Sequence, residues 1–323
     1  MSRRTLWLKS KLYNQLVNPN MVYTYDVDTI GTVGFKQNNR AALQTAINAA
    51  ASAGQGFYIT QPHGIDTTGL TIPSNSNIRF VGAGALKLAG TNGGTYTSDS
   101  HNMLLLNGVS NVVIENARLY GSKELNTLTS GEYGMGINIS GACSGIILDS
   151  PMIYDNWGDG LYMGSGNSSN VEIYGMRIHN SRRNGISIIS SNGLNMVDTE
   201  VYNIIDTNPK AAMDFEPNQN SDLLKNIRIV GFKSIRCQNG IAFSFQNVPG
   251  ATAQVVDIII SDFEDYFCRD SAISTYNLAK GTNSVSGNIA FNNPIYVHSN
   301  NVRDTAGWDN SVTVTITNAT TIA

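Results

Sequence analysis

Ala212-Met213-Asp214-Phe215-Glu216-Pro217-Asn218 is a stretch in which apolar and acidic side chains alternate. In an extended strand, successive side chains point to opposite faces of the backbone. Met213 and Phe215 are therefore predicted to face a core, and Asp214 and Glu216 to face outward together. At ~3.3 Å per residue, the two acidic residues lie roughly 6.5–7 Å apart along the strand. Two solvated surface acids would give the same pattern, so this stretch needs support from the rest of the chain.

Short strands of the same kind recur along the chain. One class opens with Gly or Ala and then alternates: Gly136-Ile137-Asn138-Ile139, Gly160-Leu161-Tyr162-Met163, Gly185-Ile186-Ser187-Ile188, Ala212-Met213-Asp214-Phe215 and Gly240-Ile241-Ala242-Phe243. The apolar second residues of these strands are 24, 25, 27 and 28 residues apart. Between them lie two further strand classes, for example Asn170-Val171-Glu172-Ile173 and Met176-Arg177-Ile178-His179.

Three short strands in each repeating unit, without long helices between them, predict an all-β parallel β-helix. Each coil then stacks on the next, and Asn residues at matching turns stack into ladders. A β-sandwich is the alternative architecture. It requires antiparallel hairpins at a spacing of roughly 8–12 residues, which the longer period disfavours.

One N-terminal helix is predicted near residues 39–53, with Asn38 or Asn39 as its N-cap and Gly54 at its end. Its short apolar face suits a helix that caps the open end of a larger core. We therefore expect an N-terminal linker or cap segment over residues 1–35. The β-helix is expected over residues 36–300, and a C-terminal strand segment over residues 301–323.

Composition excludes several classes of protein. The chain has 323 residues, a net charge of −3 and only 14% charged residues, which disfavours nucleic-acid partners and anionic membranes. Its three cysteines, Cys143, Cys237 and Cys268, are too few and too widely spaced for a disulfide framework or a zinc site, and are expected to be buried thiols. No apolar run is long enough for a signal peptide or a membrane helix.

Several motifs resemble those of known β-helix proteins. The region 39–84 resembles the opening of pectate-lyase-like proteins, whereas Gly131–Ile137, Trp157–Tyr162 and Asn208–Asn218 resemble motifs of bacteriophage tailspike depolymerases. The resemblance extends over roughly residues 30–300. The acidic run that usually precedes the helix is replaced here by Gly34–Asn39. The particle-anchoring head of a tailspike is missing, or is reduced to residues 1–30.

The resemblance implies a right-handed β-helix with three strands per coil that assembles as a homotrimer. It also implies attachment to a phage tail, outside the host cell, and action on a bacterial surface polysaccharide: a capsule, an exopolysaccharide or an O-antigen. No cofactor is implied. A calcium site of the kind found in pectate-cleaving lyases would need more clustered acids than one strand supplies.

The proposed register of the coils places several candidate residues in one outward row: Asn138, Tyr162, Ser187, Asp214 and Ala242. Gly164, Ile189 and Glu216 form the next row. Two nearby carboxyl groups suit glycosidic bond cleavage, with one as the acid and the other as base or nucleophile. Asp214 and Glu216 are therefore the predicted catalytic pair. Asp159 is a third candidate, although Gly-Asp-Gly is also a common turn sequence.

The predicted substrate-binding residues surround this pair: Glu132, Tyr133, Trp157, Tyr162, Arg182, Arg183 and Ser187. Aromatic rings stack on sugars, and Tyr154 is expected beside the same groove. The two arginines suit either an acidic sugar or the tuning of a carboxylate, but ordinary surface charge explains them as well.

Hydrolysis of a polysaccharide is the function these residues predict. A lyase on the same fold is an alternative, with Arg183 and Tyr162 as candidates for neutralising a sugar carboxylate and removing a proton. A non-catalytic receptor-binding spike is a second alternative. The four histidines lie outside these motifs, and no His/Cys cluster occurs, so neither a nucleophilic triad nor a metal site is predicted.

Overall fold

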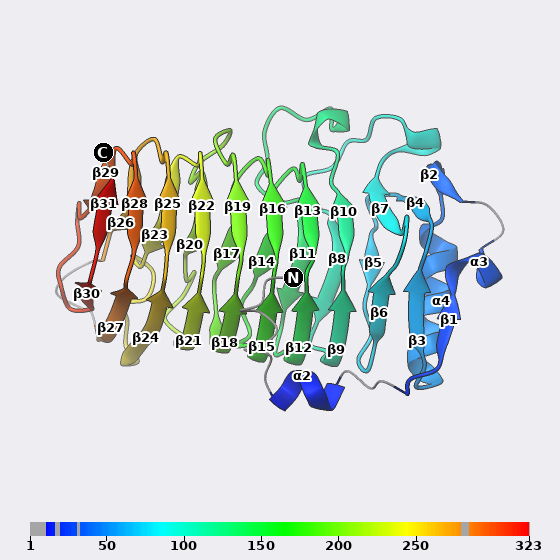
Figure 1. The fold of residues 1–323 in the computed structure, drawn as a ribbon, viewed down its shortest axis with the longest axis horizontal. Coiled ribbons are helices and arrows are strands. Elements are labelled where there is room, and N and C mark those ends of the chain that lie inside the picture. The colour runs from blue at the N-terminus through cyan, green and yellow to red at the C-terminus, as the bar shows by residue number, and fades with distance from the viewer. Residues whose placement is uncertain (1–10, 17–19, 31–32, 279–283, 323) are drawn as a thin grey trace.

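The computed structural model describes residues 11–16, 20–30, 33–278 and 284–322. Its strands follow one another around three sheets that run along the molecule (Figure 1). Sheet A contains β1 (Tyr23–Tyr25), β3 (Gly56–Ile59), β6 (Asn77–Phe80), β9 (Ser110–Glu115), β12 (Ser144–Asp149), β15 (Ser169–Tyr174), β18 (Ser191–Val197), β21 (Leu224–Val230), β24 (Gln254–Ser261), β27 (Val285–Asn292) and β30 (Thr313–Thr317).

Sheet B contains β2 (Gly34–Asn38), β4 (Pro62–Ile65), β7 (Ala85–Leu88), β10 (Arg118–Tyr120), β13 (Met152–Tyr154), β16 (Arg177–His179), β19 (Glu200–Tyr202), β22 (Lys233–Ile235), β25 (Glu264–Tyr266), β28 (Ile295–Val297) and β31 (Thr320–Ile322). Sheet C contains β5 (Leu70–Thr71), β8 (Asn102–Asn107), β11 (Met135–Ser140), β14 (Leu161–Met163), β17 (Ile186–Ile188), β20 (Ala211–Phe215), β23 (Asn239–Ser244), β26 (Ser271–Tyr276) and β29 (Asn301–Asp304).

Neighbouring strands in each sheet belong to successive coils and pair in parallel, as in β14 with β17 and β17 with β20. This arrangement is a parallel β-helix. The antiparallel sandwich is therefore excluded for the part of the chain that the structure describes. Inward side chains from successive coils line up in rows along each sheet. In sheet C one such row includes Ile186, Met213 and Ile241, all fully buried. Burying each such side chain contributes roughly 1.5–3 kcal/mol.

Asparagine ladders support the turns between coils, as the repeated Asn positions predicted. Asn111 donates from its side-chain amide to Asn75 at 3.1 Å, and Asn226 donates to Asn192 at 2.9 Å. Asn75, Asn111 and Asn226 have positive φ angles, a backbone conformation that asparagine tolerates better than most residues. The same residue type thus shapes the turn and links it to the next coil.

The helices lie outside the coils: α2 (Lys11–Leu16), α3 (Asp26–Thr29) and α4 (Arg40–Ser52), with 3₁₀ turns at Thr91–Gly93 and Lys123–Leu125. α4 occupies the region where a helix was predicted. It buries Leu43 and Ile47 at the N-terminal end of the stack (Figure 1). The Asn39 side chain makes no capping hydrogen bond, whereas Asn38 Oδ1 accepts one from the Arg40 amide at 3.2 Å.

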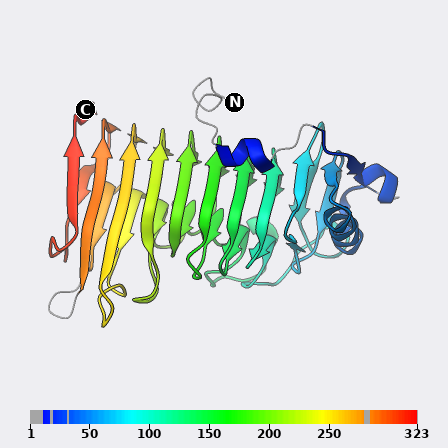
Figure 2. The same ribbon diagram turned by 90° about the horizontal axis from the view of Figure 1, so that it is seen from below.

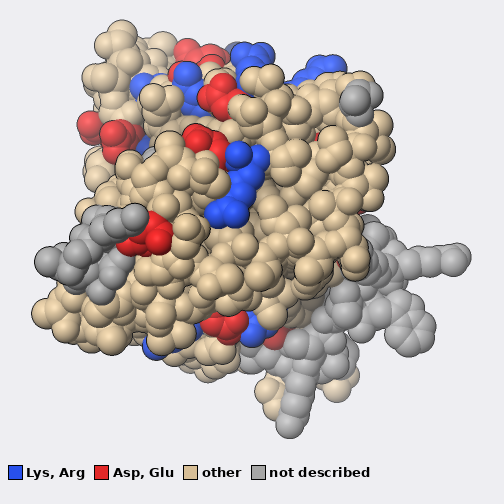
Figure 3. Space-filling view, turned by 90° about the vertical axis from the view of Figure 1, so that its left-hand side faces the viewer, with Lys and Arg blue, Asp and Glu red and all other residues tan. Residues whose placement is uncertain are grey.

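α2 lies across the outer face of sheet A (Figure 2). Tyr13 packs with Val113, Ile147 and Tyr174, and its hydroxyl donates to Asp149 at 2.6 Å. The end of the molecule that holds the C-terminal coils shows charged residues of both signs, several of them side by side, on a largely uncharged surface (Figure 3). Within the described residues, no helix is long and apolar enough to cross a membrane.

Candidate active site

The outward row of sheet C follows the predicted register. Asn138 pairs with Tyr162, Tyr162 with Ser187, Ser187 with Asp214, and Asp214 with Ala242. The same row continues through Ser274 to Asp304, two positions that the sequence interpretation did not follow. The two neighbours of Asp214 in this row, Ser187 and Ala242, both have small side chains.

Asp214 lies in this outward row but is fully buried. Neither of its carboxylate oxygens has a hydrogen-bond partner in the part of the chain that the structure describes. Burial raises the pKa of Asp214 well above its ordinary value, and the charge of Glu216 raises it further. The charge of Arg183 and the nearby amide of Asn184 oppose the rise. Asp214 is therefore a carboxyl group that holds its proton unusually tightly.

This burial differs from the sequence expectation of two exposed acids on one face. Glu216 follows the last residue of β20, and its side chain is 23% exposed, whereas that of Asp214 is inaccessible. Alternation along a strand predicts which way a side chain points. It does not predict what covers it, which here includes side chains from other coils.

Arg183 joins two of the three candidate carboxylates. Its guanidinium lies 3.3 Å from Asp159 through Nη1 and 3.0 Å from Glu216 through Nη2. The side chain is only 11% exposed, and its Nε has no hydrogen-bond partner among the described residues. Burial alone would lower the pKa of Arg183, but the charges of Asp159 and Glu216 raise it instead, so the guanidinium stays protonated.

Asp159 accepts hydrogen bonds that hold neighbouring residues of the site in place, and it is also a titratable group. Its Oδ2 accepts a hydrogen bond from the Ser187 hydroxyl at 2.7 Å, and its Oδ1 accepts one from the Asn184 amide at 3.0 Å. Burial raises the pKa of Asp159 to about 6, even though Arg183 and these hydrogen bonds act to lower it. The structure thus brings Asp159 together with Asp214, Glu216 and Arg183.

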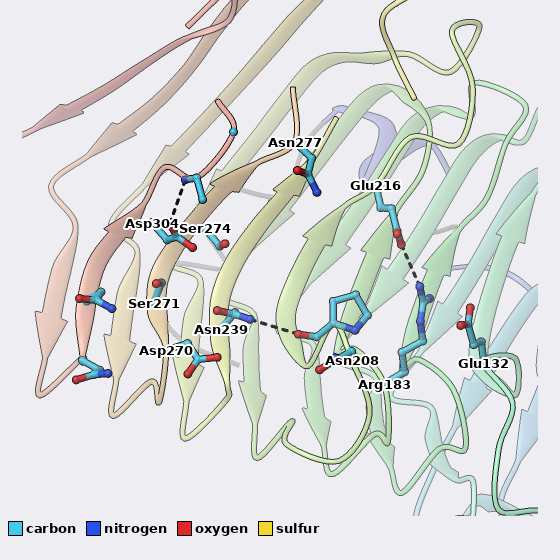
Figure 4. A pocket seen from close by; sticks show the side chains of 15 residues that line it. Glu132, Arg183, Asn208, Glu216, Asn239, Asp270, Ser271, Ser274, Asn277 and Asp304 are labelled. Atoms are coloured by element: carbon cyan, nitrogen blue, oxygen red, sulfur yellow. Dashed lines mark hydrogen bonds and ion pairs between the residues drawn. The ribbon is translucent and has the colours of Figure 1, made fainter. Parts of the chain in front are cut away.

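A cavity of about 910 Å³ opens beside Glu216 and Arg183 and extends toward the C-terminal coils. Asn208, Asn239, Asp270, Ser271, Ser274, Asn277 and Asp304 are among its lining residues (Figure 4). The sequence interpretation missed all of these. A signal was available for part of this set, because the regular register carries the row of Asp214 onward to Ser274 and Asp304.

A smaller cavity of about 120 Å³ lies on the other side of the Arg183–Glu216 pair. Glu132, Tyr133 and Tyr162 line it, in agreement with their predicted grouping. Tyr133 is 57% exposed, so its ring is available to a ligand. Burial raises the pKa of Tyr162 to about 12, with a contribution from the charge of Asp159.

Trp157 and Arg182 line neither of these cavities. Trp157 is buried, and the Arg182 guanidinium lies 4.2 Å from the centre of its ring. Arg182 Nη1 also donates to the Gly131 carbonyl at 2.6 Å, which supports the segment that carries Glu132. Tyr154 is on sheet B, stacked between Tyr120 and His179, and not beside the groove as expected.

In the part of the chain that the structure describes, no three His, Cys, Asp or Glu side chains converge as a possible metal site. The arrangement offers instead one buried carboxyl group, one partly exposed carboxylate held by an arginine, and an adjoining groove. This combination suits proton transfer to and from a bound ligand.

The sequence matches no protein-family model and no curated protein. By structure, the chain is similar to an iota-carrageenase solved with iota-carrageenan fragments, with a TM-score of 0.57 and 16% identity over 83% of this chain and 60% of that chain. It is also similar to the endo-xylogalacturonan hydrolase of Aspergillus tubingensis, with a TM-score of 0.50, 15% identity and coverages of 90% and 93%. It is also similar to the exopolygalacturonase of Thermotoga maritima, with a TM-score of 0.50 and 11% identity over 97% of this chain and 96% of that chain. The shared feature is the β-helix fold.

Proposed function

We propose that this protein hydrolyses glycosidic bonds of a polysaccharide. The proposed catalytic carboxyl groups lie at the end of the groove on sheet C, which is the cavity of about 910 Å³ beside Glu216 and Arg183. The observation that carries the proposal is the buried, unpartnered carboxyl of Asp214 beside the Arg183–Glu216 pair. Isolated polar groups are costly to bury, so such a group marks a site built for chemistry. The three polysaccharide-degrading enzymes with the same fold support this interpretation by analogy alone.

Asp214 and Glu216 have environments that separate their roles. Burial raises the pKa of Asp214 well above its ordinary value, so this residue keeps its proton to higher pH than an exposed aspartate and is the proposed general acid. Arg183 stabilises the negative charge of Glu216, which lines the groove and can serve as the base. Because Asp214 is fully buried, donation to a sugar oxygen requires a covering side chain to move.

The separation of the two acids along the strand favours inversion of configuration. Inverting enzymes hold their carboxyl groups roughly 6.5–9.5 Å apart and retaining enzymes ~5–5.5 Å apart. The ideal backbone spacing of two residues along a strand, roughly 6.5–7 Å, is nearer the first range, and on this ground water activated by Glu216 is the proposed nucleophile. The anomeric form of the first product, followed by proton NMR, distinguishes the two outcomes.

The proposed setting is that of a phage tailspike. In this setting the chain forms a homotrimer at the virion tail, outside the host cell, and cleaves a capsule, an exopolysaccharide or an O-antigen for host recognition. The motifs around Trp157–Tyr162 and Asn208–Asn218 support this setting by resemblance. Incubation with surface polysaccharides from a strain panel, with mass analysis of the products, tests it directly.

Conservative variants test the catalytic assignment. Asp214→Asn and Glu216→Gln keep the side-chain shapes and remove only the ionisable groups. Each is expected to reduce reducing-end release by roughly 10²–10⁴-fold. Glu200→Gln, a carboxylate on sheet B remote from the groove, is the matched control and should keep full activity. Full activity in both site variants would show that the pair is not catalytic.

A lyase is the main alternative chemistry. Tyr162 and Arg183 border the same small cavity, which is the arrangement that a tyrosine base beside a cation would require. The pKa of Tyr162 is raised to about 12, however, which opposes its deprotonation near neutral pH. New ultraviolet absorbance from unsaturated products would favour the lyase. Binding without any cleavage would favour a receptor-binding spike.

A further inference from the structure

The charges of the groove discriminate between classes of polysaccharide. Four acidic residues line the cavity of about 910 Å³: Glu132, Glu216, Asp270 and Asp304. Among its described lining residues, Arg183 is the only cation. Asp270 and Asp304 are exposed and lie beyond the proposed catalytic residues, on the side where the groove extends (Figure 4). A bound chain therefore meets a surface with an excess of negative charge.

Arg183 is not free to bind an acidic sugar. Its two terminal nitrogens already lie at 3.3 Å from Asp159 and 3.0 Å from Glu216. A sugar carboxylate would have to compete with two protein carboxylates for one guanidinium. Arg182, the other candidate, stacks on Trp157 and donates to the Gly131 carbonyl, and it lines neither cavity.

Neutral hydrogen-bonding groups supply the rest of the polar lining, with five asparagines and two serines. Side-chain amides offer both donors and acceptors, which match sugar hydroxyl and N-acetyl groups. A cavity of this size lies near the upper end of ligand pockets, and it runs across β20, β23, β26 and β29, roughly 14 Å at ~4.8 Å per strand. The groove is thus built for several sugar units held by neutral hydrogen bonds.

Building on the proposed cleavage of a polysaccharide, we infer that the substrate is a neutral or amino-sugar-containing glycan, and not a uronate or sulfate polymer. Acidic groups on the glycan would approach Asp270 and Asp304, whereas the one cation among the described lining residues, Arg183, already pairs with Asp159 and Glu216. Amino groups would be attracted by the same two residues. This substrate class also disfavours the lyase, since elimination requires a uronic acid.

The test compares polysaccharides that have identical linkages and differ in charge. A panel of uronate-containing bacterial polysaccharides is compared with the same polymers after reduction of their carboxyl groups to alcohols, together with neutral and amino-sugar polysaccharides. Binding is measured by affinity electrophoresis with the Asp214→Asn variant, which leaves the charged lining of the groove unchanged. Reducing-end release is measured separately with the wild-type protein.

We expect each reduced polymer that binds to do so at least about fivefold more tightly than its unreduced parent at ~50 mM salt. This difference should shrink at ~0.5 M salt because like-charge repulsion is screened. Tighter or equal binding of the uronate form, or no binding by any neutral or amino-sugar polymer, overturns the inference. Selective binding without cleavage by the wild type would leave this inference standing and refute the proposed hydrolysis. Cleavage confined to uronate polymers would overturn this inference and leave the proposed cleavage of a polysaccharide standing.

Charge-neutralising variants identify the residues responsible. Asp270→Asn combined with Asp304→Asn should strengthen binding of uronate polymers severalfold and change binding of neutral polymers less than about twofold. Asp28→Asn combined with Glu124→Gln is the control of equal charge change, because these two exposed acids, on α3 and in the 3₁₀ turn Lys123–Leu125, line neither cavity. If the double variant and the control behave alike toward uronate polymers, these two carboxylates do not select the substrate.

Discussion

Replacing Asp159 by Asn should change how the stability of this protein depends on pH. Burial raises the pKa of Asp159 from its ordinary 3.8 to about 6 in the folded protein. In the unfolded chain the carboxyl is hydrated and ionises near its ordinary value. Between about pH 4 and pH 6 the folded state therefore binds more protons than the unfolded state, so the free energy of unfolding falls as pH rises.

The magnitude follows from the shift, which is 6 − 3.8, or about 2 pKa units. At 1.36 kcal/mol per unit, ionisation of Asp159 costs the folded state on the order of 3 kcal/mol by pH 7. Asn cannot ionise and does not have this cost. Relative to wild type, the variant should thus gain on the order of 3 kcal/mol between pH 4 and pH 7. This pH-dependent gain is expected whatever free energy of unfolding Asp159→Asn loses through weaker contacts to Ser187 and Arg183.

Urea unfolding, followed by circular dichroism at one protein concentration between pH 4 and pH 7.5, measures this difference. Asp214 is present in both proteins, but the charge of Asp159 contributes to the raised pKa of Asp214, so loss of this charge adds to the measured difference in the same direction. Asp28→Asn is the control and should stay parallel to wild type across the series. A difference between wild type and Asp159→Asn that is constant with pH would refute the reasoning, because Asp159 would then be as well solvated in the folded protein as in the unfolded chain.

Three further predictions concern the core, the groove and the assembly. Phe215→Ala should lower the free energy of unfolding by about 3–5 kcal/mol, because the fully buried ring stacks on Phe243 at 4.9 Å; a loss below about 1 kcal/mol in urea would show a loosely packed core. Asn301→Trp, at an exposed lining position on β29, should fill the groove and weaken polysaccharide binding by affinity electrophoresis at least about tenfold without shifting the urea midpoint, and unchanged binding would place the substrate elsewhere. Light scattering should give three times the chain mass of 34.8 kDa; a monomer at micromolar concentration would contradict the trimer.

The sequence alone was sufficient for the fold and for the register of the candidate site. The strands of the Gly-led class alternate inward apolar residues with outward residues that are polar except at Ala242, and successive coils repeat the pattern at a nearly constant spacing. Stacking such coils in parallel has one consistent register, since a shift by one residue would turn the apolar side chains outward. For this reason the sequence predicts Tyr162, Ser187 and Asp214 in one row, and the strand register of the structure confirms it.

Only the tertiary structure decided the chemistry of that row. Asp214 is buried and Glu216 is not, although both were expected on one outward face. Arg183 bridges Asp159, 24 residues before it, and Glu216, 33 residues after it. Ionisation depends on solvation and on charges within a few ångströms, and here both come from neighbouring coils and their connecting segments. The sequence pattern sets the direction of each side chain, whereas packing between coils determines what covers it and which charges lie beside it.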